Sequence, residues 1–173
     1  MIEILNKYLY LNESGELFWK VRDESFYNGD KAKAQRFNRN YTAQKIIGGK
    51  NSRGYPTMQV EGKSYLIHRV IWMLHNGKEL EKGVTIDHID RNKENNNPSN
   101  LRLASHQQQS YNKDSNGYYF CKTKQKYIVE IKQDKNKMHI GIFNTELEAK
   151  AARFTAEKLL HGRYAKHINK EVA

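Results

Sequence analysis

A run of asparagines between two strand-like segments constrains the fold of this chain more than any other feature. Residues 91–100 contain five Asn and one Pro, and they follow a β-branched segment at 84–90 that ends in polar residues. Asn side chains bond to nearby backbone groups and tolerate unusual backbone angles, so the run predicts a loop. An extended segment resumes at 101–103, and Ser105 is placed to cap a short helix that continues to Asn112.

The chain before this loop predicts a second set of elements. Residues 17–21 form a short strand-like run, and residues 55–60 and 64–66 form a hairpin with Gly62 in the turn. Apolar residues at helical spacing from Ile67 onward predict a helix that stops at Gly77. Residues 22–45 are polar, basic and without clear periodicity, which favours a long loop or a partly ordered arm.

A separate unit begins near Gly117. Residues 118–120, 127–133 and 137–143 predict three strands, with Tyr127, Val129 and Ile131 on one side of the middle strand. Thr145 and Glu148 form a capping-box pattern at the start of a helix, and Gly162 follows its end. The apolar residues at helical spacing along this helix are Leu147, Ala151, Ala152, Phe154, Ala156 and Leu159.

The charge balance excludes some classes of protein and favours one class of partner. Thirty Lys and Arg face nineteen Asp and Glu, a net charge of +11, which favours a polyanionic partner. No apolar run approaches the roughly 20 residues of a membrane span, and the first eleven residues do not resemble a signal peptide. A single cysteine, Cys121, excludes a disulfide framework and a Cys-rich zinc site. We therefore expect a cytoplasmic location.

Asp87 and His88 are the residues with the clearest chemical potential. Hydrolysis of a phosphodiester needs a group that takes a proton from the attacking water and positive charge on the phosphate. Histidine suits the first task, and a carboxylate can hold a divalent cation for the second. Neighbouring side chains on a strand point apart, so the two residues can serve separate tasks. By itself an Asp-His pair also suits a surface position at a strand end.

The surrounding residues resemble the HNH homing endonucleases of bacteriophages. The resemblance rests on residues 87–96, on Asn100-Leu101-Arg102, on residues 14–20, on Gly54-Tyr55 and on His68-Arg69, and it extends over most of residues 8–112. It implies a ββα-metal unit in which His88 is the general base, Asp87 is a metal ligand, and Asn100 braces the loop. It also implies one divalent ion, Mg²⁺ or Mn²⁺.

The second metal ligand is the point at which this chain departs from that family. The family usually places Asn or His seven residues after the Arg of Asn-Leu-Arg, and this chain has Gln109 there. Gln carries the same carbonyl oxygen on a longer arm. Asn112 shares the helical face and is the alternative ligand.

Four other polar residues nearby have alternative interpretations. Asp90 is a possible additional ligand, although a residue that enters a turn more often binds its own backbone. His68 and His75 share a helical face with Trp72, which favours a polar-aromatic surface under the site, or one that touches phosphate, over a second metal centre. We assign Arg69, on the same helix, to DNA binding.

The unit after residue 113 is similar to the DNA-binding domain of plant ethylene-response factors, the Apetala family. The similarity rests on residues 117–120, 126–131, 140–145, 148–152 and 161–162 and on Asn169, while Tyr127 and His139 stand where that family more often has Trp. It implies that the sheet lies in the major groove. The sheet residues expected to face DNA are Lys122, Lys124, Lys126, Glu130, Lys132, Lys137 and His139.

Together these patterns predict an α+β endonuclease with a nuclease domain at 1–113 and a DNA-binding domain at 114–173. We expect a monomer that acts on double-stranded DNA without a membrane. A DNA-binding protein with a decayed nuclease centre, for example a regulator, is the alternative, and Gln109 is the feature that favours it. Basic charge and eleven Tyr leave a single-strand or RNA binder as a third hypothesis.

Overall fold

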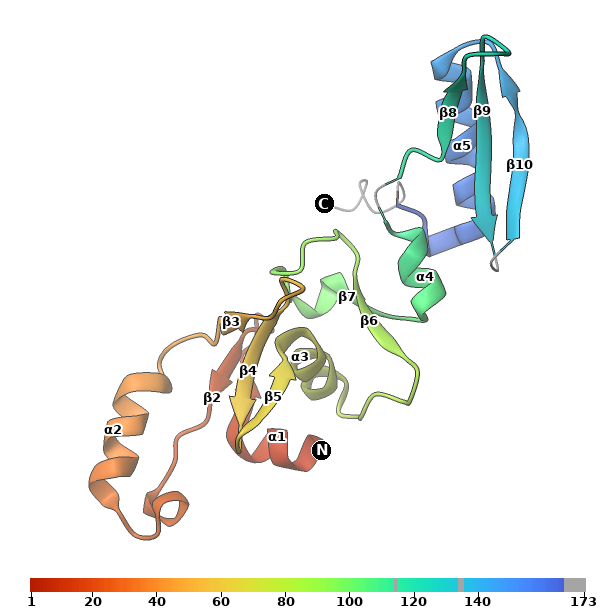
Figure 1. Ribbon diagram of the computed structural model, residues 1–173. Coiled ribbons are helices and arrows are strands. Elements are labelled where there is room, and N and C mark those ends of the chain that lie inside the picture. Colours follow the sequence, from red (N-terminus) through yellow and green to blue (C-terminus); the bar gives the residue numbers. More distant parts are fainter. Residues whose placement is uncertain (114, 134–135, 167–173) are drawn as a thin grey trace. The chain divides into compact units, whose positions relative to one another are not determined.

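The computed structural model describes residues 1–113, 115–133 and 136–166, so Asn169 lies outside the described residues (Figure 1). The chain forms two compact units of mixed helix and strand. The N-terminal unit comprises Met1–His88 and Asn92–Leu103, and the C-terminal unit comprises Ile89–Arg91 and the chain from Ala104 onward. The predicted domain boundary after residue 113 stays a prediction.

The N-terminal unit contains three small sheets, with strand orders β1-β2, β3-β4-β5 and β6-β7. Its elements are α1 (Ile2–Tyr8), β1 (Leu9–Leu11), β2 (Leu17–Trp19), the 3-10 turn η1 (Glu24–Tyr27), α2 (Lys31–Tyr41), β3 (Gly49–Lys50), β4 (Pro56–Val60), β5 (Lys63–Leu66), α3 (Ile67–Asn76), β6 (Thr85–His88), the 3-10 turn η2 (Pro98–Asn100) and β7 (Leu101–Ala104), at whose end the C-terminal unit begins.

The predicted hairpin and the helix after it are confirmed. Val60 of β4 pairs with Lys63 of β5, so two residues form the turn. Glu61 and Gly62 have φ of 49° and 73°, the left-handed pair that a tight hairpin turn requires. Helix α3 follows directly and ends at Gly77, whose φ of 64° closes it as predicted.

The prediction of a loop or partly ordered arm over residues 22–45 is wrong. The segment contains η1 and the eleven-residue helix α2, which begins where the Asp30 side chain accepts a hydrogen bond from the Lys33 amide. Among the residues of α2 only Ala34 is buried, so the apolar periodicity is too weak to reveal the helix from the sequence. Contacts with aromatic residues elsewhere in the chain stabilise it.

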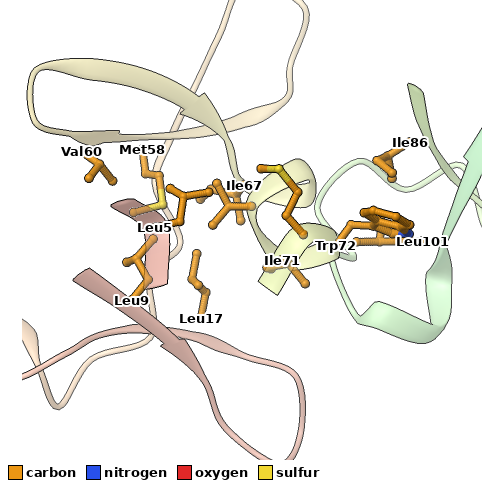
Figure 2. Close-up of a cluster of buried hydrophobic side chains, with 12 residues drawn as sticks. Leu5, Leu9, Leu17, Met58, Val60, Ile67, Ile71, Trp72, Ile86 and Leu101 are labelled. Carbon is orange, nitrogen blue, oxygen red and sulfur yellow. The ribbon is translucent and has the colours of Figure 1, made fainter. Parts of the chain in front are cut away.

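The core of the N-terminal unit is organised around α3 (Figure 2). Leu5, Leu9 and Leu17, from α1, β1 and β2, are at most 1% exposed and pack on one side of the helix. Trp72 extends from α3 toward Ile86 of β6 and Leu101 of β7. Helix α3 therefore joins the N-terminal strands to the two strands on either side of the Asn-rich loop.

The C-terminal unit has one antiparallel sheet of order β10-β9-β8, with a long helix packed on it (Figure 1). Ser105 and Thr145 both form the capping boxes that open the two α-helices, as predicted for Thr145 with Glu148. Its elements are α4 (His106–Tyr111), β8 (Tyr118–Cys121), β9 (Lys126–Gln133), β10 (Asn136–Phe143), α5 (Glu146–His161) and the 3-10 turn η3 (Gly162–Tyr164).

The pattern predicted α5 but not the face that it buries. Leu147, Phe154 and Leu159 are 77%, 39% and 78% exposed. The buried residues are instead Ala149, Arg153, Ala156, Glu157 and His161. Small alanines let the helix approach the sheet closely, and Arg153 and Glu157 neutralise each other's charge there. No helix among the described residues is long and apolar enough to cross a membrane.

Candidate active site

Strand β6 places Asp87 and His88 on opposite sides of the backbone, because side chains alternate along a strand. His88 shares a side with Ile86, which packs in the core beside α3. Asp87 is 9% exposed and His88 is 4% exposed. The two side chains therefore point apart, and their separate roles at a metal and at a water stay a prediction.

The Asn-rich loop orients the ring of His88. His88 Nε2 lies 3.0 Å from Asn96 Oδ1, while Asn96 Nδ2 donates to the carbonyl of Glu94 at 3.3 Å. Because Oδ1 of Asn96 accepts, Nε2 of neutral His88 carries the proton. The unprotonated nitrogen of that tautomer is Nδ1, the atom that can accept a proton.

Two aromatic rings of the N-terminal unit pack around His88. The centroid of the His68 ring lies 5.1 Å from that of His88 at an interplanar angle of 71°, and the Tyr55 centroid lies 6.1 Å away. Tyr55 also contacts His68 at 5.2 Å. The interpretation of His68 as part of a polar-aromatic surface beside the candidate base agrees with these contacts.

His68 is held in its neutral form. Burial, and to a smaller extent the nearby charges of His88 and Arg69, lower its pKa from 6.5 to about 3. Its Nδ1 has no hydrogen-bond partner within the described part of the chain. His68 therefore supplies a neutral wall beside His88 at physiological pH.

An ion pair between Asp87 and Arg102 was not foreseen from the sequence. Arg102 of β7 donates from Nε and Nη2 to the same oxygen, Asp87 Oδ2, at 2.9 and 2.8 Å. Both side chains are 11% exposed, so the guanidinium neutralises a largely buried carboxylate. The sequence feature that could have revealed this ion pair is Arg102 itself, because it lies on β7, the strand that pairs with β6.

The asparagines build the loop between β6 and β7 through local hydrogen bonds. Asn100 is 9% exposed, and its Nδ2 donates to the carbonyl of Asn95 at 2.7 Å. Asn97 Oδ1 accepts from the Ser99 amide at 3.0 Å, and Asn92 Oδ1 accepts from the Glu94 amide at 3.0 Å. These bonds fold the loop locally, and the bracing role of Asn100 stays a prediction.

The predicted second metal ligands lie in the C-terminal unit, whereas Asp87 lies in the N-terminal unit. Gln109 is a half-buried residue of α4, and Asn112 is its 3% exposed C-cap. Asn112 Nδ2 lies 3.5 Å from the carbonyl oxygen of Ile89, within the same unit. The pairing of either amide with Asp87 stays a prediction, as does any ligand role for Asp90.

The donor chemistry fits a hard divalent cation. The described residues contain no group of three or more His, Cys, Asp or Glu that could hold a metal ion. A site of the predicted kind needs none, because it combines one carboxylate with an amide oxygen. Oxygen donors are those that Mg²⁺ and Mn²⁺ prefer, and Mg²⁺ often keeps several waters beside one or two carboxylates.

The sheet of the C-terminal unit presents the residues that we expected to face DNA. His139 pairs with Glu130 and Lys137 with Lys132, so these four share the face opposite Val129 and Ile131. Lys126 lies on the same face, and Lys122 and Lys124 lie between β8 and β9. Arg69, also expected to contact DNA, is half-buried on α3 of the other unit.

One of the expected contacts is already satisfied inside the protein. Lys137 Nζ forms an ion pair with Glu130 Oε2 at 2.5 Å, which raises the pKa of the lysine. The remaining lysines of this face are exposed. The face is therefore basic, with one internal ion pair.

Residues 65–111 match the family model of HNH endonucleases. They include α3, β6, the Asn-rich loop, β7 and α4. An uncharacterized HNH endonuclease of Acanthamoeba polyphaga mimivirus is 47% identical over 62 residues, which is 36% of this chain and 33% of that protein. The match thus spans about a third of the relative's length. No solved structure is significantly similar to the chain.

Proposed function

We propose that this protein is a metal-dependent DNA endonuclease that hydrolyses phosphodiester bonds through the HNH segment at residues 65–111. The observation that carries the proposal is the oriented His88 ring directly beside Asp87, within the segment that matches this family. By its resemblance to phage proteins we assign it to the homing type.

His88 is the proposed general base. Asn96 accepts a hydrogen bond from Nε2, so Nδ1 takes the proton of the attacking water. The bond to Asn96 also stabilises the imidazolium that results, because an amide oxygen accepts more strongly from a charged donor. The neutral His68 ring adds no opposing charge when His88 becomes protonated.

Asp87 is the proposed metal ligand, with Gln109 or Asn112 as the second. When bound, one Mg²⁺ or Mn²⁺ ion would supply positive charge to the phosphate and to the leaving 3′-oxygen. Arg102 balances the charge of the Asp87 carboxylate within the buried site. Asn100 holds the loop in the shape that places Asn96 against His88.

The C-terminal unit is the proposed site-recognition module, of the ethylene-response-factor type. Lys contacts to phosphate would position the protein, and contacts to base edges would select the sequence. The basic sheet face, with Lys126, Lys132 and His139, supports this assignment.

Substitution of His88 tests the function. We expect His88→Ala to lower single-turnover cleavage of duplex DNA by about 10²- to 10⁴-fold, the usual contribution of a general base. Binding to the same DNA in EDTA should be unchanged. His75→Ala is the matched control, because His75 is an exposed histidine of α3, and it should cleave at the wild-type rate. Cleavage by His88→Ala at the wild-type rate would refute the assignment.

A second candidate function is DNA binding without cleavage. Gln109 departs from the family pattern, and Arg102 already occupies one oxygen of Asp87. The two functions are separated by incubating the protein with end-labelled DNA in Mg²⁺, in Mn²⁺ and in EDTA. Binding without strand breaks under either metal would favour the second function, whereas metal-dependent breaks establish the first.

A further inference from the structure

A thirty-residue stretch of the N-terminal unit is basic and has no acidic residue of its own, although Lys45 and Lys50 within it form ion pairs with Glu16 and Glu94. Residues 31–60 contain seven Lys or Arg and no Asp or Glu. This segment therefore carries much of the net charge of +11 of the whole protein. Four of the seven lie on α2: Lys31, Lys33, Arg36 and Arg39. The proposed nuclease site and the sheet module do not account for this concentration of charge.

Helix α2 separates its charged side chains from its contacts with the protein. Ala34, Phe37 and Asn38 are buried or half-buried and face the rest of the unit. Lys33, Arg36 and Arg39 are exposed and follow one another at a spacing of three residues along the other side. A rise of about 1.5 Å per residue spreads these three charges over about 9 Å.

The arrangement has an energetic cost to the isolated helix. Like charges three residues apart repel one another and destabilise a helix. Asp30, the acidic residue that precedes the helix, caps its N-terminus, where its carboxylate accepts a hydrogen bond from the Lys33 amide. A polyanion bound along the face would relieve this repulsion.

The helix is nevertheless held firmly to its unit through Arg22. The Arg22 guanidinium lies 3.8 Å from the centre of the Phe37 ring and 5.1 Å from that of Trp19. The Asn38 side chain forms two bonds with the Arg22 backbone: its Oδ1 accepts from the amide at 2.9 Å, and its Nδ2 donates to the carbonyl at 2.8 Å. Figure 1 shows α2 beyond β2 and β3, held out from the small sheets.

We propose that the exposed face of α2, formed by Lys33, Arg36 and Arg39, binds the sugar-phosphate backbone of duplex DNA. The inference rests on the proposed action on DNA and adds a contact surface outside the nuclease segment and the sheet module. Long cationic side chains on a fixed helix reach phosphates without reading bases. The contact is therefore independent of the DNA sequence. It adds affinity and helps to fix the position of the protein along the duplex.

The test compares two triple variants with equal loss of charge. One is Lys33→Gln, Arg36→Gln and Arg39→Gln, which keeps helix propensity because Gln is a good helix former. The matched control is Lys63→Gln, Lys78→Gln and Lys82→Gln, three exposed lysines of the same unit. Fluorescence anisotropy of a labelled DNA duplex in EDTA gives the affinity over a series of salt concentrations, and circular dichroism checks the helix content.

We expect the α2 variant to bind DNA about 10- to 100-fold more weakly at low salt. The slope of log K against log salt should become less steep by about 2 to 3, since each phosphate contact contributes about 0.9 to it. The control should lose less than about 1 from the slope. Wild-type affinity and slope in the α2 variant, or an equal loss in the control, would overturn the proposal.

The outcome is distinguishable from a failure of the nuclease function. If the wild-type protein cuts DNA and the α2 variant binds like it, only the α2 contact is refuted. If the wild-type protein binds without cutting and the α2 variant loses affinity, the α2 contact stands and the nuclease function falls.

Discussion

The two units of this protein bury their polar residues in different surroundings. The N-terminal unit places a polar site at the edge of a dry core of twelve buried apolar side chains arranged along α3. The C-terminal unit places a charged pair, Arg153 and Glu157, between its helix and its sheet. The C-terminal unit also buries apolar residues such as Val129 and Ile131, but its helix contacts the sheet partly through this ion pair.

The polar network of the C-terminal unit reaches from α5 to the strand beneath it. Arg153 donates from Nε to Glu157 Oε1 at 2.7 Å and from Nη1 to the carbonyl of Glu130 at 2.6 Å. Gly117 lies so close that a Cβ there would be 2.3 Å from Arg153 Nε. A glycine with a φ of +65° is therefore required at this position.

The difference bears on the stability of the C-terminal unit. A buried ion pair is costly to break by removing one partner, because the other charge remains out of water. Removal of either Arg153 or Glu157 alone should therefore destabilise the C-terminal unit.

The largest expected effect is on the stability of the C-terminal unit. Arg153→Met should lower its free energy of unfolding by about 3–5 kcal/mol, because it leaves the Glu157 carboxylate buried without the guanidinium. Urea unfolding followed by circular dichroism measures the change, and Lys158→Met, an exposed site on the same helix, is the control. Addition of Glu157→Leu to Arg153→Met should recover most of the loss, and a failure to recover would contradict the charge argument.

The next largest effect is a pH dependence of the stability of the N-terminal unit, through His68. The folded-state pKa of His68 is about 3, below its ordinary value of 6.5, so the unfolded chain takes up the proton first as the pH falls. Stability is therefore fully present above pH 6.5 and is lost as the pH falls toward 3. From pH 6.5 to 4 this group alone should cost about 3 kcal/mol, at about 1.4 kcal/mol for each pH unit.

His68→Phe removes this titration while it keeps a ring beside His88. Its free energy of unfolding, measured by urea at a series of pH values, should fall less steeply than that of the wild-type protein below pH 6.5. Parallel curves for the two proteins would show that His68 is not held neutral by burial. The exposed His75→Phe serves as the matched control.

The smallest expected effect concerns the basic sheet face that we propose for DNA recognition. Lys132→Gln on the exposed side of β9 should lower the slope of log K against log salt by about 1 and weaken binding equally for all duplex sequences, as for one phosphate contact. Lys158→Gln, exposed on α5, should leave the slope unchanged. Anisotropy measurements with two duplexes of unrelated sequence distinguish a phosphate contact from a base contact. A loss of affinity that depends on the DNA sequence would indicate a base contact instead.

Local patterns predicted most elements because their signals are short-range. The two-residue turn at Glu61-Gly62, the stop at Gly77 and the capping box at Thr145 each depend on neighbouring residues only. The helix α2 and the buried face of α5 depended on distant partners. Phe37 of α2 contacts Trp19 and Arg22. Arg153 of α5 is held in the interior by hydrogen bonds to the Glu130 carbonyl and the Glu157 carboxylate.

The sequence by itself determined the order of the helices and strands from β4 onward, the Asn-rich loop and the position of Asp87 and His88 on a strand before it. The alternation of a strand was enough to separate the two side chains. Only the tertiary structure decided what surrounds them: Asn96 and His68 at His88, and Arg102 at Asp87. These contacts join residues that are between eight and twenty positions apart, where chain topology rather than local propensity sets the distance.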